Sequence, residues 1–197
     1  MKFKNPPVNS LSLELLTEFI ISLEKLENDK TFRGIILTSK DVEDFECGCP
    51  SSQTLQAGEG VRSLLQQHMV TAASAEHPEP GAHAQKHLLP WSGACPAGGC
   101  LISLTCDYRI LADNPKYLMG LNETLLGIVA PFWFKDTFVN TIGHRASEQA
   151  LQLGLLFRPA EALQVGLVDQ VVPEDQVLST ALSVMARWMA IPAWSFW

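Results

Sequence analysis

The chain has 197 residues, which suits one domain or at most two small ones, and its 47% hydrophobic and 18% charged content is typical of a globular protein. Fourteen basic against twenty-one acidic residues give a net charge of −7, and no basic block argues for nucleic-acid binding. Every apolar run is shorter than the ~20 residues that a membrane-spanning helix needs, so no span is expected.

The first ten residues contain neither the apolar stretch of a secretory signal nor the arginines of a transit peptide, so the sequence predicts that no presequence is present. Five cysteines, an odd number without a secretory signal, favour reduced thiols. The cysteine spacings differ from those of zinc sites, and buried thiols are the preferred interpretation. The histidines at 77, 83 and 87 are likewise interpreted as part of an exposed loop, so no metal site is expected.

In the first part of the chain, a helix is expected to follow Ser10 or Ser12, either of which can cap it. Apolar residues then recur at helical spacing, at Leu13, Leu16, Phe19, Ile20, Leu23 and Leu26. Residues 33–38, rich in isoleucine, predict a buried strand. A helix followed by a buried strand is typical of α/β folds.

The pattern is weaker over residues 40–91. One helix is predicted over 61–71, and residues 76–90, with three prolines, are expected to form a long loop. Order returns at residue 94: a helix start or tight turn is expected over 98–105, and strands over 106–112 and 117–120. Further helices are then predicted over 132–142, 146–156, 159–166 and 176–189, and a strand over 167–172.

Residues 94–123 contain the most informative chemistry. Gly98 and Gly99 precede a small-residue apolar run, and glycines let a backbone N–H approach a ligand closely. Glu123 lies between Asn122 and an apolar segment, where a carboxylate can become a proton-transfer base. The sequence therefore indicates a site that removes a proton beside a carbonyl group, although packing glycines and a helix-terminal carboxylate are the alternatives.

Several motifs resemble the crotonase (enoyl-CoA hydratase/isomerase) superfamily: GACPAGGC at 93–100, TCDYRILAD at 105–113, GLNE at 120–123, GHRASEQALQLGLLF at 143–157 and AEALQVGLVDQVVP at 160–173. The resemblance covers residues 1–39 and 93–192. It implies an α/β fold, the ClpP/crotonase spiral of ββα units. One domain over 1–192 is expected, with a divergent insert at 40–92, a truncated C-terminal helical part and a short tail at 193–197.

The same resemblance implies an oxyanion hole of two backbone N–H groups that bind the thioester carbonyl of an acyl-CoA. These donors fall on Cys49 and Gly98, and the catalytic glutamate falls on Glu123. Substrate-binding roles are implied for Cys47, Gly48, Pro50, Ser51 and Asn122, although Asn122 equally suits a turn. Fixed N–H dipoles stabilise the developing enolate oxygen by about 3–4 kcal/mol per donor.

Hydratases of this superfamily use a second glutamate directly after the GGC segment, and that position here is Leu101. One base is enough to move a proton from C2 to C4, so the resemblance favours an isomerase that converts 3-enoyl-CoA into 2-trans-enoyl-CoA in fatty-acid β-oxidation. It also implies a mitochondrial matrix protein without a cofactor, because coenzyme A is part of the substrate. Family members form trimers, an assembly that the shortened C-terminus argues against.

Two departures from the family pattern lead to an alternative hypothesis. The strand before Gly93 would fall near residues 85–92, where Pro90, Lys86 and His87 are poor residues for a central strand. The family's C-terminal helices are not matched after Pro192. The alternative is a catalytically impaired protein that binds acyl-CoA or joins oligomers of active relatives.

Overall fold

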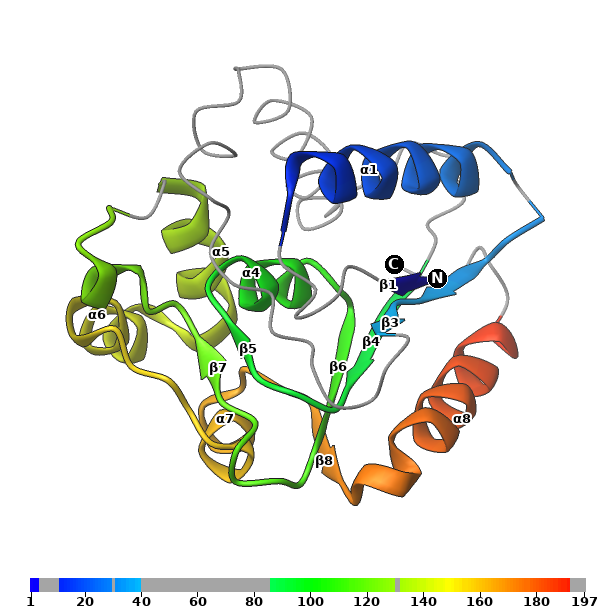
Figure 1. Ribbon diagram of the computed structural model, residues 1–197. Helices are drawn as coiled ribbons and strands as arrows, with labels where there is room; N and C mark the ends of the chain where they lie inside the picture. Colours follow the sequence, from blue (N-terminus) through cyan, green and yellow to red (C-terminus); the bar gives the residue numbers. More distant parts are fainter. Residues whose placement is uncertain (4–10, 30, 40–85, 130–131, 192–197) are drawn as a thin grey trace.

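The computed structural model describes residues 1–3, 11–29, 31–39, 86–129 and 132–191, and Figure 1 shows helices packed around a small parallel sheet. The sheet has the order β2-β4-β6-β8, with every neighbouring pair parallel. Its strands are β2 (Gly34–Ile36), β4 (Lys86–Trp91), β6 (Tyr108–Ala112) and β8 (Gln170–Val172). Parallel strands with helical connections confirm the predicted α/β class.

Two short parallel pairs lie beside this sheet. One joins β1 (Lys2–Phe3) to β3 (Thr38–Ser39), and the other joins β5 (Cys95–Pro96) to β7 (Met119–Gly120). The strand predicted over 33–38 is thus divided, since Leu37 lies between β2 and β3 and its N–H donates to the Leu88 carbonyl at 2.9 Å.

The helices follow the sequence prediction closely. They are α1 (Leu13–Asn28), α4 (Gly98–Leu104), η1 (Glu123–Leu126), α5 (Phe132–Ile142), α6 (His144–Leu153), α7 (Pro159–Val165), η2 (Glu174–Gln176) and α8 (Val177–Met189). Ser12 caps α1, because its Oγ accepts the Leu15 N–H at 3.2 Å. Pro159 opens α7, and the Arg158 N–H donates to Glu161 Oε2 at 2.9 Å. The helix predicted over 61–71 lies outside the described residues.

The two faces of the sheet bury different cores, because successive strand residues point to opposite faces. Leu89 and Leu111 contribute to a large core that includes residues of α1, α4, α5 and α6. Leu88 and Ile110, their immediate neighbours, contribute to a smaller core with α8. Figure 1 shows α1 and α8 on opposite sides of the sheet. The sheet therefore separates the layer that contains α4 from the layer formed by α8.

The concern that residues 85–92 cannot form the supporting strand is wrong, because β4 is an internal strand paired with both β2 and β6. Asp107 binds the two polar residues at the start of β4. Lys86 Nζ lies 3.1 Å from Asp107 Oδ1, and the His87 N–H donates to Oδ2 at 2.7 Å. Residues 86–91 of the predicted divergent insert at 40–92 thus form a strand of the sheet, and residues 40–85 lie outside the described part.

Pro90 is accommodated by the register of β4. The Lys86 N–H and the Leu88 carbonyl bond toward β2, whereas the His87 carbonyl accepts the Asp107 N–H. Alternate residues of a strand bond to opposite neighbours, so the nitrogen of Pro90 faces the β2 side. Pairing with β2 stops at Ile36 and Leu88, whereas Pro90 still pairs with Ile110 of β6. The missing N–H of proline is thus located beyond the last β2–β4 pair.

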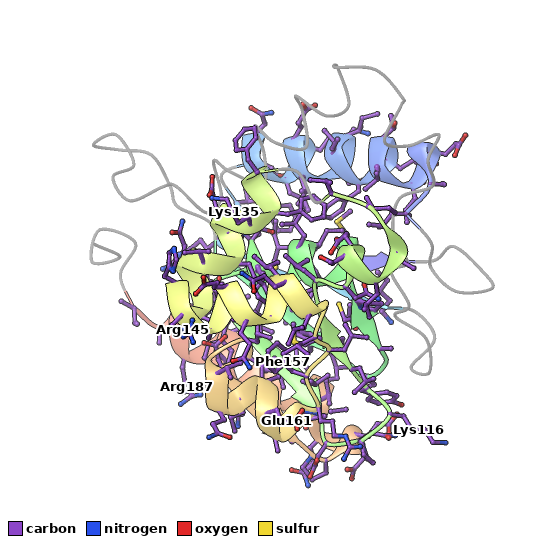
Figure 2. All side chains as sticks on the ribbon, turned by 90° about the vertical axis from the view of Figure 1, so that its left-hand side faces the viewer. Lys116, Lys135, Arg145, Phe157, Glu161 and Arg187 are labelled. Atoms are coloured by element: carbon purple, nitrogen blue, oxygen red, sulfur yellow. The ribbon has the colours of Figure 1, made fainter. Side chains whose placement is uncertain are left out.

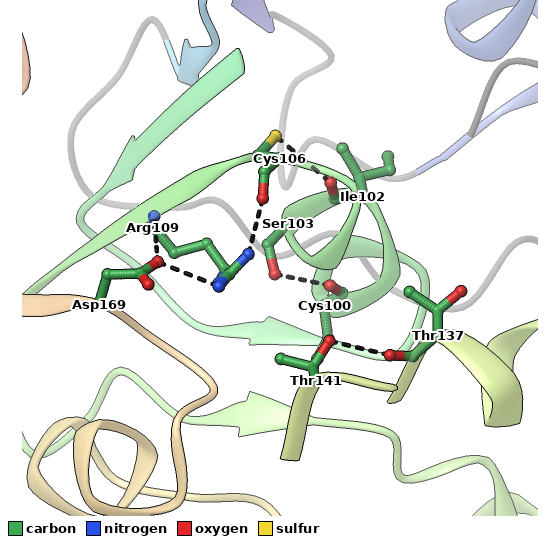
Figure 3. Close-up of polar contacts among 8 residues, drawn as sticks. All are labelled: Cys100, Ile102, Ser103, Cys106, Arg109, Thr137, Thr141 and Asp169. Atoms are coloured by element: carbon green, nitrogen blue, oxygen red, sulfur yellow. Dashed lines mark hydrogen bonds and ion pairs between the residues drawn. The ribbon is translucent and has the colours of Figure 1, made fainter. Parts of the chain in front are cut away.

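Long-range polar contacts join the ends of this fold. Arg33 donates from its guanidinium to the carbonyls of Met189 at 3.1 Å and Ile191 at 2.6 Å, which caps the end of α8. In Figure 3, Arg109 of β6 binds Asp169, with the Arg109 N–H 2.8 Å and Nη2 3.1 Å from Oδ2. These contacts fix the end of α8 to the start of the edge strand β2, and the start of β8 to β6.

Candidate active site

The pairing of β5 with β7 brings the glycine segment and the glutamate into one place. Cys95 pairs with Met119 and Pro96 with Gly120. The pairing continues for one residue, as the Ala97 N–H donates to the Gly120 carbonyl at 2.8 Å. Gly98 begins α4 directly after this point, and Glu123 follows Gly120 by three residues.

Ala97 has an unusual backbone conformation, with φ 52° and ψ −119°. A positive φ is uncommon for a residue with a Cβ and costs on the order of 1–3 kcal/mol. This conformation sets the plane of the peptide that contains the Gly98 N–H. The first N–H groups of a helix have no partner within it, so the geometry is that of a backbone donor available to an external oxygen.

Glu123 is the first residue of η1, and its side chain is only 3% exposed. Within the described part of the chain, neither of its carboxylate oxygens has a hydrogen-bond partner. Burial raises the pKa of Glu123 above its ordinary value, and its own backbone N–H opposes this with a smaller lowering. A buried carboxylate with an elevated pKa is suited to act as a general base.

The turn that contains Glu123 is fixed by its backbone and by α6. The Glu123 carbonyl accepts the Ile128 N–H at 3.1 Å. Thr124 Oγ1 donates to the Leu151 carbonyl of α6 at 2.7 Å. The glutamate is therefore held by hydrogen bonds that do not use its carboxylate, which stays available for chemistry.

Asn122 occupies the turn that the sequence suggested as one of its two roles, since its carbonyl accepts the Leu125 N–H at 3.0 Å. Its side-chain Oδ1 is buried and has no hydrogen-bond partner among the described residues. The turn role is thus observed, and a role in substrate binding stays a prediction.

The predicted site residues divide into two groups. Gly98, Asn122 and Glu123 lie on the connected β5–β7 framework. Five others lie outside the described residues, so their predicted roles stay untested: Cys47, Gly48, Cys49, Pro50 and Ser51. No group of three histidine, cysteine or acidic side chains is placed to hold a metal ion in the described ranges. None of the helices described there is both long and apolar enough to cross a membrane.

A comparison with protein families decides the classification, because the family model described as "Enoyl-CoA hydratase/isomerase" matches residues 1–196. The chain belongs to the enoyl-CoA hydratase/isomerase family. This confirms the predicted resemblance, and the solved structures of the family confirm the crotonase-like fold.

Human enoyl-CoA delta isomerase 1, mitochondrial, is 63% identical to this family member over 98% of the chain and 62% of the human protein. The rat protein of the same name is 59% identical over 98% of the chain and 65% of its own length. The crystal structure of human mitochondrial delta3-delta2-enoyl-CoA isomerase has 61% identity and a TM-score of 0.84, and covers 98% of this chain and 73% of that one. The chain thus spans less than two thirds of the curated relatives.

Sequence reasoning missed three features of this enoyl-CoA hydratase/isomerase family member. No feature of the sequence predicts the positive φ of Ala97, because alanine does not favour such a backbone conformation. Gly120 has φ 152°, and an added Cβ would lie 2.4 Å from the Leu155 carbonyl oxygen. Cys100 was interpreted only as a buried thiol, and the effect of the Glu123 charge, which adds to burial in raising the pKa of Cys100, depends on the tertiary structure.

Proposed function

We propose that the chain is an isomerase that converts 3-enoyl-CoA into 2-trans-enoyl-CoA, with Glu123 as its proton-transfer base. The observation that supports this most is the buried carboxylate of Glu123, which has an elevated pKa and no side-chain partner in the described ranges. The β5–β7 pairing joins its turn to the segment that begins with Gly98, as enolate chemistry with a base and a backbone donor requires, and the curated relatives that the chain resembles are delta isomerases.

In the proposed reaction, the carboxylate of Glu123 takes a proton from C2 of the 3-enoyl thioester. The electron pair of that C–H bond moves toward the thioester carbonyl, which becomes a dienolate oxygen. The N–H groups of Gly98 and Cys49 stabilise this negative charge. Glu123 then returns the proton to C4, the C3–C4 double bond becomes a single bond, and a C2–C3 double bond forms. The balance needs no cofactor, and coenzyme A enters as part of the substrate.

Leu101 supports isomerisation over hydration. It lies in α4 and is 2% exposed, within the large core. Hydration more naturally uses two carboxylates, of which one activates water, and an apolar Leu101 cannot supply the second. We infer that Glu123 acts alone as a proton shuttle.

The names of the relatives support a mitochondrial location for this chain as well. We further propose that the acyl-CoA thioester contacts Asn122 and residues 47–51, through Cys47, Gly48, Pro50 and Ser51.

A continuous assay tests the proposed activity. Purified chain is mixed with a 3-enoyl-CoA, and formation of the 2-enoyl thioester is followed at the absorbance of the conjugated product. Glu123→Gln is expected to lower kcat/KM by at least ~100-fold, because a general base contributes about 10²–10⁴-fold. Glu148→Gln is the matched control: Glu148 is exposed on α6 and pairs with Arg145 at 2.9 Å, so its activity should equal that of the wild type.

Two results would contradict the proposal. One is turnover by Glu123→Gln at the wild-type rate. The other is a wild-type chain that unfolds cooperatively and binds CoA but forms no conjugated product, which would favour the non-catalytic alternative.

A further inference from the structure

A groove on the α8 side of the sheet contains polar side chains for which the fold supplies few partners. It is lined by residues of α8 and of β8, an edge strand of the sheet, and its volume is about 400 Å³. A volume of this order falls in the range of small-molecule sites. The lining residues are Gln170, Ser179, Thr180, Ser183, Val184 and Arg187.

The strand side of the groove is set by the register of β8. Gln170 pairs with Ile110 of β6, and paired residues of parallel strands place their side chains on the same face of the sheet. Ile110 belongs to the smaller core with α8, so the side chain of Gln170 is on the α8 face. Val184 of α8 is 2% exposed and belongs to the same core. The groove therefore borders well-packed elements on both sides.

The helix side of the groove combines hydroxyl groups with a guanidinium. Ser179, Ser183 and Arg187 are spaced four residues apart, so they follow one side of α8. Ser179 Oγ donates to the Gln176 carbonyl at 3.0 Å and can still accept a hydrogen bond. Within the described ranges, the side chains of Thr180, Ser183 and Arg187 have no hydrogen-bond or ion-pair partner.

Other hydroxyls on helices of this chain donate to the preceding turn. Ser22 Oγ donates to the Glu18 carbonyl at 2.7 Å. Thr141 Oγ1 donates to the Thr137 carbonyl at 2.8 Å, as Figure 3 shows. Such bonds use the single hydroxyl proton of the side chain. The two unbonded hydroxyls of the groove therefore keep both their donor and their acceptor capacity for a ligand.

The charges around the groove favour an anion at its Arg187 end. Asp169, next to Gln170 in sequence, pairs with Arg109 at 3.1 Å, and Glu174 accepts a tyrosine hydroxyl at 2.7 Å. Asp175 is exposed before α8 and lies about 18 Å from Arg187 along the helix axis, beyond the Debye length of about 8 Å. A guanidinium binds a phosphate group through two parallel N–H donors.

We propose that this groove binds a small phosphate monoester with hydroxyl groups, such as a sugar phosphate. Arg187 holds the phosphate group, while Thr180, Ser183 and the Gln170 amide bind the sugar hydroxyls. Hydroxyl and amide side chains both donate and accept hydrogen bonds, which matches the alcohol groups of a sugar. The site lies across the sheet from the layer that contains Gly98, and it does not depend on the proposed isomerase function.

A titration with glucose 6-phosphate tests this proposal without turnover. Backbone N–H signals of ¹⁵N-labelled protein are followed by NMR, and those of residue 170 and of residues 179–187 should shift together and saturate, with a Kd of about 1 mM or lower. Glucose should bind at least about tenfold more weakly, because it lacks the group that pairs with Arg187. Inorganic phosphate should compete, with a higher Kd than the sugar phosphate.

Two arginines on opposite layers give a matched pair of variants. Figure 2 labels Arg187 of α8 and Arg145 of α6, and the Arg145 side chain is 89% exposed and pairs with Glu148. Arg187→Gln should raise the Kd for glucose 6-phosphate by about tenfold or more, whereas Arg145→Gln should leave it at the wild-type value. Both side chains are exposed, so both variants should fold as the wild type does.

Three results would overturn the inference. The first is no saturable shift at residue 170 or residues 179–187 up to about 20 mM glucose 6-phosphate, a concentration well above the expected Kd. The second is an unchanged Kd in Arg187→Gln, or an equal increase in Arg145→Gln. The third is an equal Kd for inorganic phosphate and glucose 6-phosphate, which would show an anion contact with no role for the hydroxyls.

Discussion

At the scale of single residues, the candidate site contains two groups that work against stability. Glu123 is a carboxyl side chain with 3% exposure and no side-chain partner in the described ranges, and Ala97 has a positive φ. Burying an unpartnered ionisable group and holding a strained backbone both cost free energy. Such costs are typical of functional sites, where the rest of the fold must offset them.

Replacement of the base should therefore stabilise the protein near neutral pH. Because the pKa of Glu123 is raised in the folded state, the unfolded chain ionises first as the pH rises past the ordinary value of 4.5. Stability from this group is thus present at low pH and falls as the pH rises through the folded pKa. Glu123→Gln should unfold at a higher temperature than wild type at about pH 7, and the gain should shrink at about pH 4.

Thermal unfolding of wild type, Glu123→Gln and Glu148→Gln at both pH values measures this effect. The exposed Glu148 serves as the control, and its variant should show no comparable dependence. A Glu123→Gln variant less stable than wild type at neutral pH would contradict the expected sign.

At the scale of elements, the site depends on the two-residue strands β5 and β7. Their short pairing, extended by the bond from the Ala97 N–H to the Gly120 carbonyl, connects the segment of Gly98 to the turn of Glu123. Gly120 is central to it, because its carbonyl accepts the Ala97 N–H and its α-carbon faces the Leu155 carbonyl. A small change at Gly120 should therefore displace both parts of the site.

Gly120→Ala should lower the free energy of unfolding by about 3 kcal/mol and abolish most activity, since the new Cβ would meet the Leu155 oxygen at 2.4 Å. The matched control is Gly143→Ala. Gly143 also has a positive φ, 80°, but nothing lies within 4 Å of its Cβ position, so the cost should be about 1 kcal/mol. Urea unfolding of both variants measures the difference, and equal losses would refute the steric explanation.

At the scale of the whole molecule, the candidate site and the core formed by α8 lie on opposite faces of the central sheet. The layer with α4 contains Gly98 and Cys100, while α8 packs on the opposite face through Val177, Ala181 and Val184. A substitution in the packing of α8 should therefore lower the free energy of unfolding without altering the site. Substitutions on the two faces should therefore have different effects, which an experiment can distinguish.

Val184→Ala should lower the free energy of unfolding by about 2 kcal/mol, because Val184 is 2% exposed and its truncation leaves a cavity. Its kcat should equal that of wild type at temperatures where the variant is folded. Leu182→Ala on the same helix is the control, since Leu182 is 56% exposed and should change little. A loss of kcat in folded Val184→Ala would show that the two layers are coupled.

Local patterns predicted most helices well, because capping and amphipathic spacing act over short distances. Ser12 and the apolar face with Leu16 and Phe19 define α1, and Pro159 with Glu161 defines the start of α7. The central strand β4 was underestimated, because Lys86 and Pro90 look unsuitable in isolation. The strand accommodates Lys86 because it pairs with Asp107, and Pro90 because pairing with β2 ends before it. Both features depend on the tertiary structure.

The site itself was predicted in part. Family resemblance indicated Gly98 and Glu123, whose common position now follows from the β5–β7 pairing. The strain at Ala97 was not predictable, because the backbone dihedrals of a non-glycine residue depend on the folded chain. The proposed donor at Cys49 still rests on resemblance alone.

The contact of Arg33 with the end of α8 has a consequence for the order in which the protein forms during synthesis. Arg33 reaches Met189 and Ile191, 156 and 158 residues later, and the α-carbon of Gly34 abuts Met185. On the ribosome, β2 emerges long before α8, so its α8-facing side stays uncovered while most of the chain is translated. During that interval the apolar Ile36, which packs against the α8 core in the folded protein, has no cover from α8, so we expect slow translation to extend the time in which nascent chains can associate.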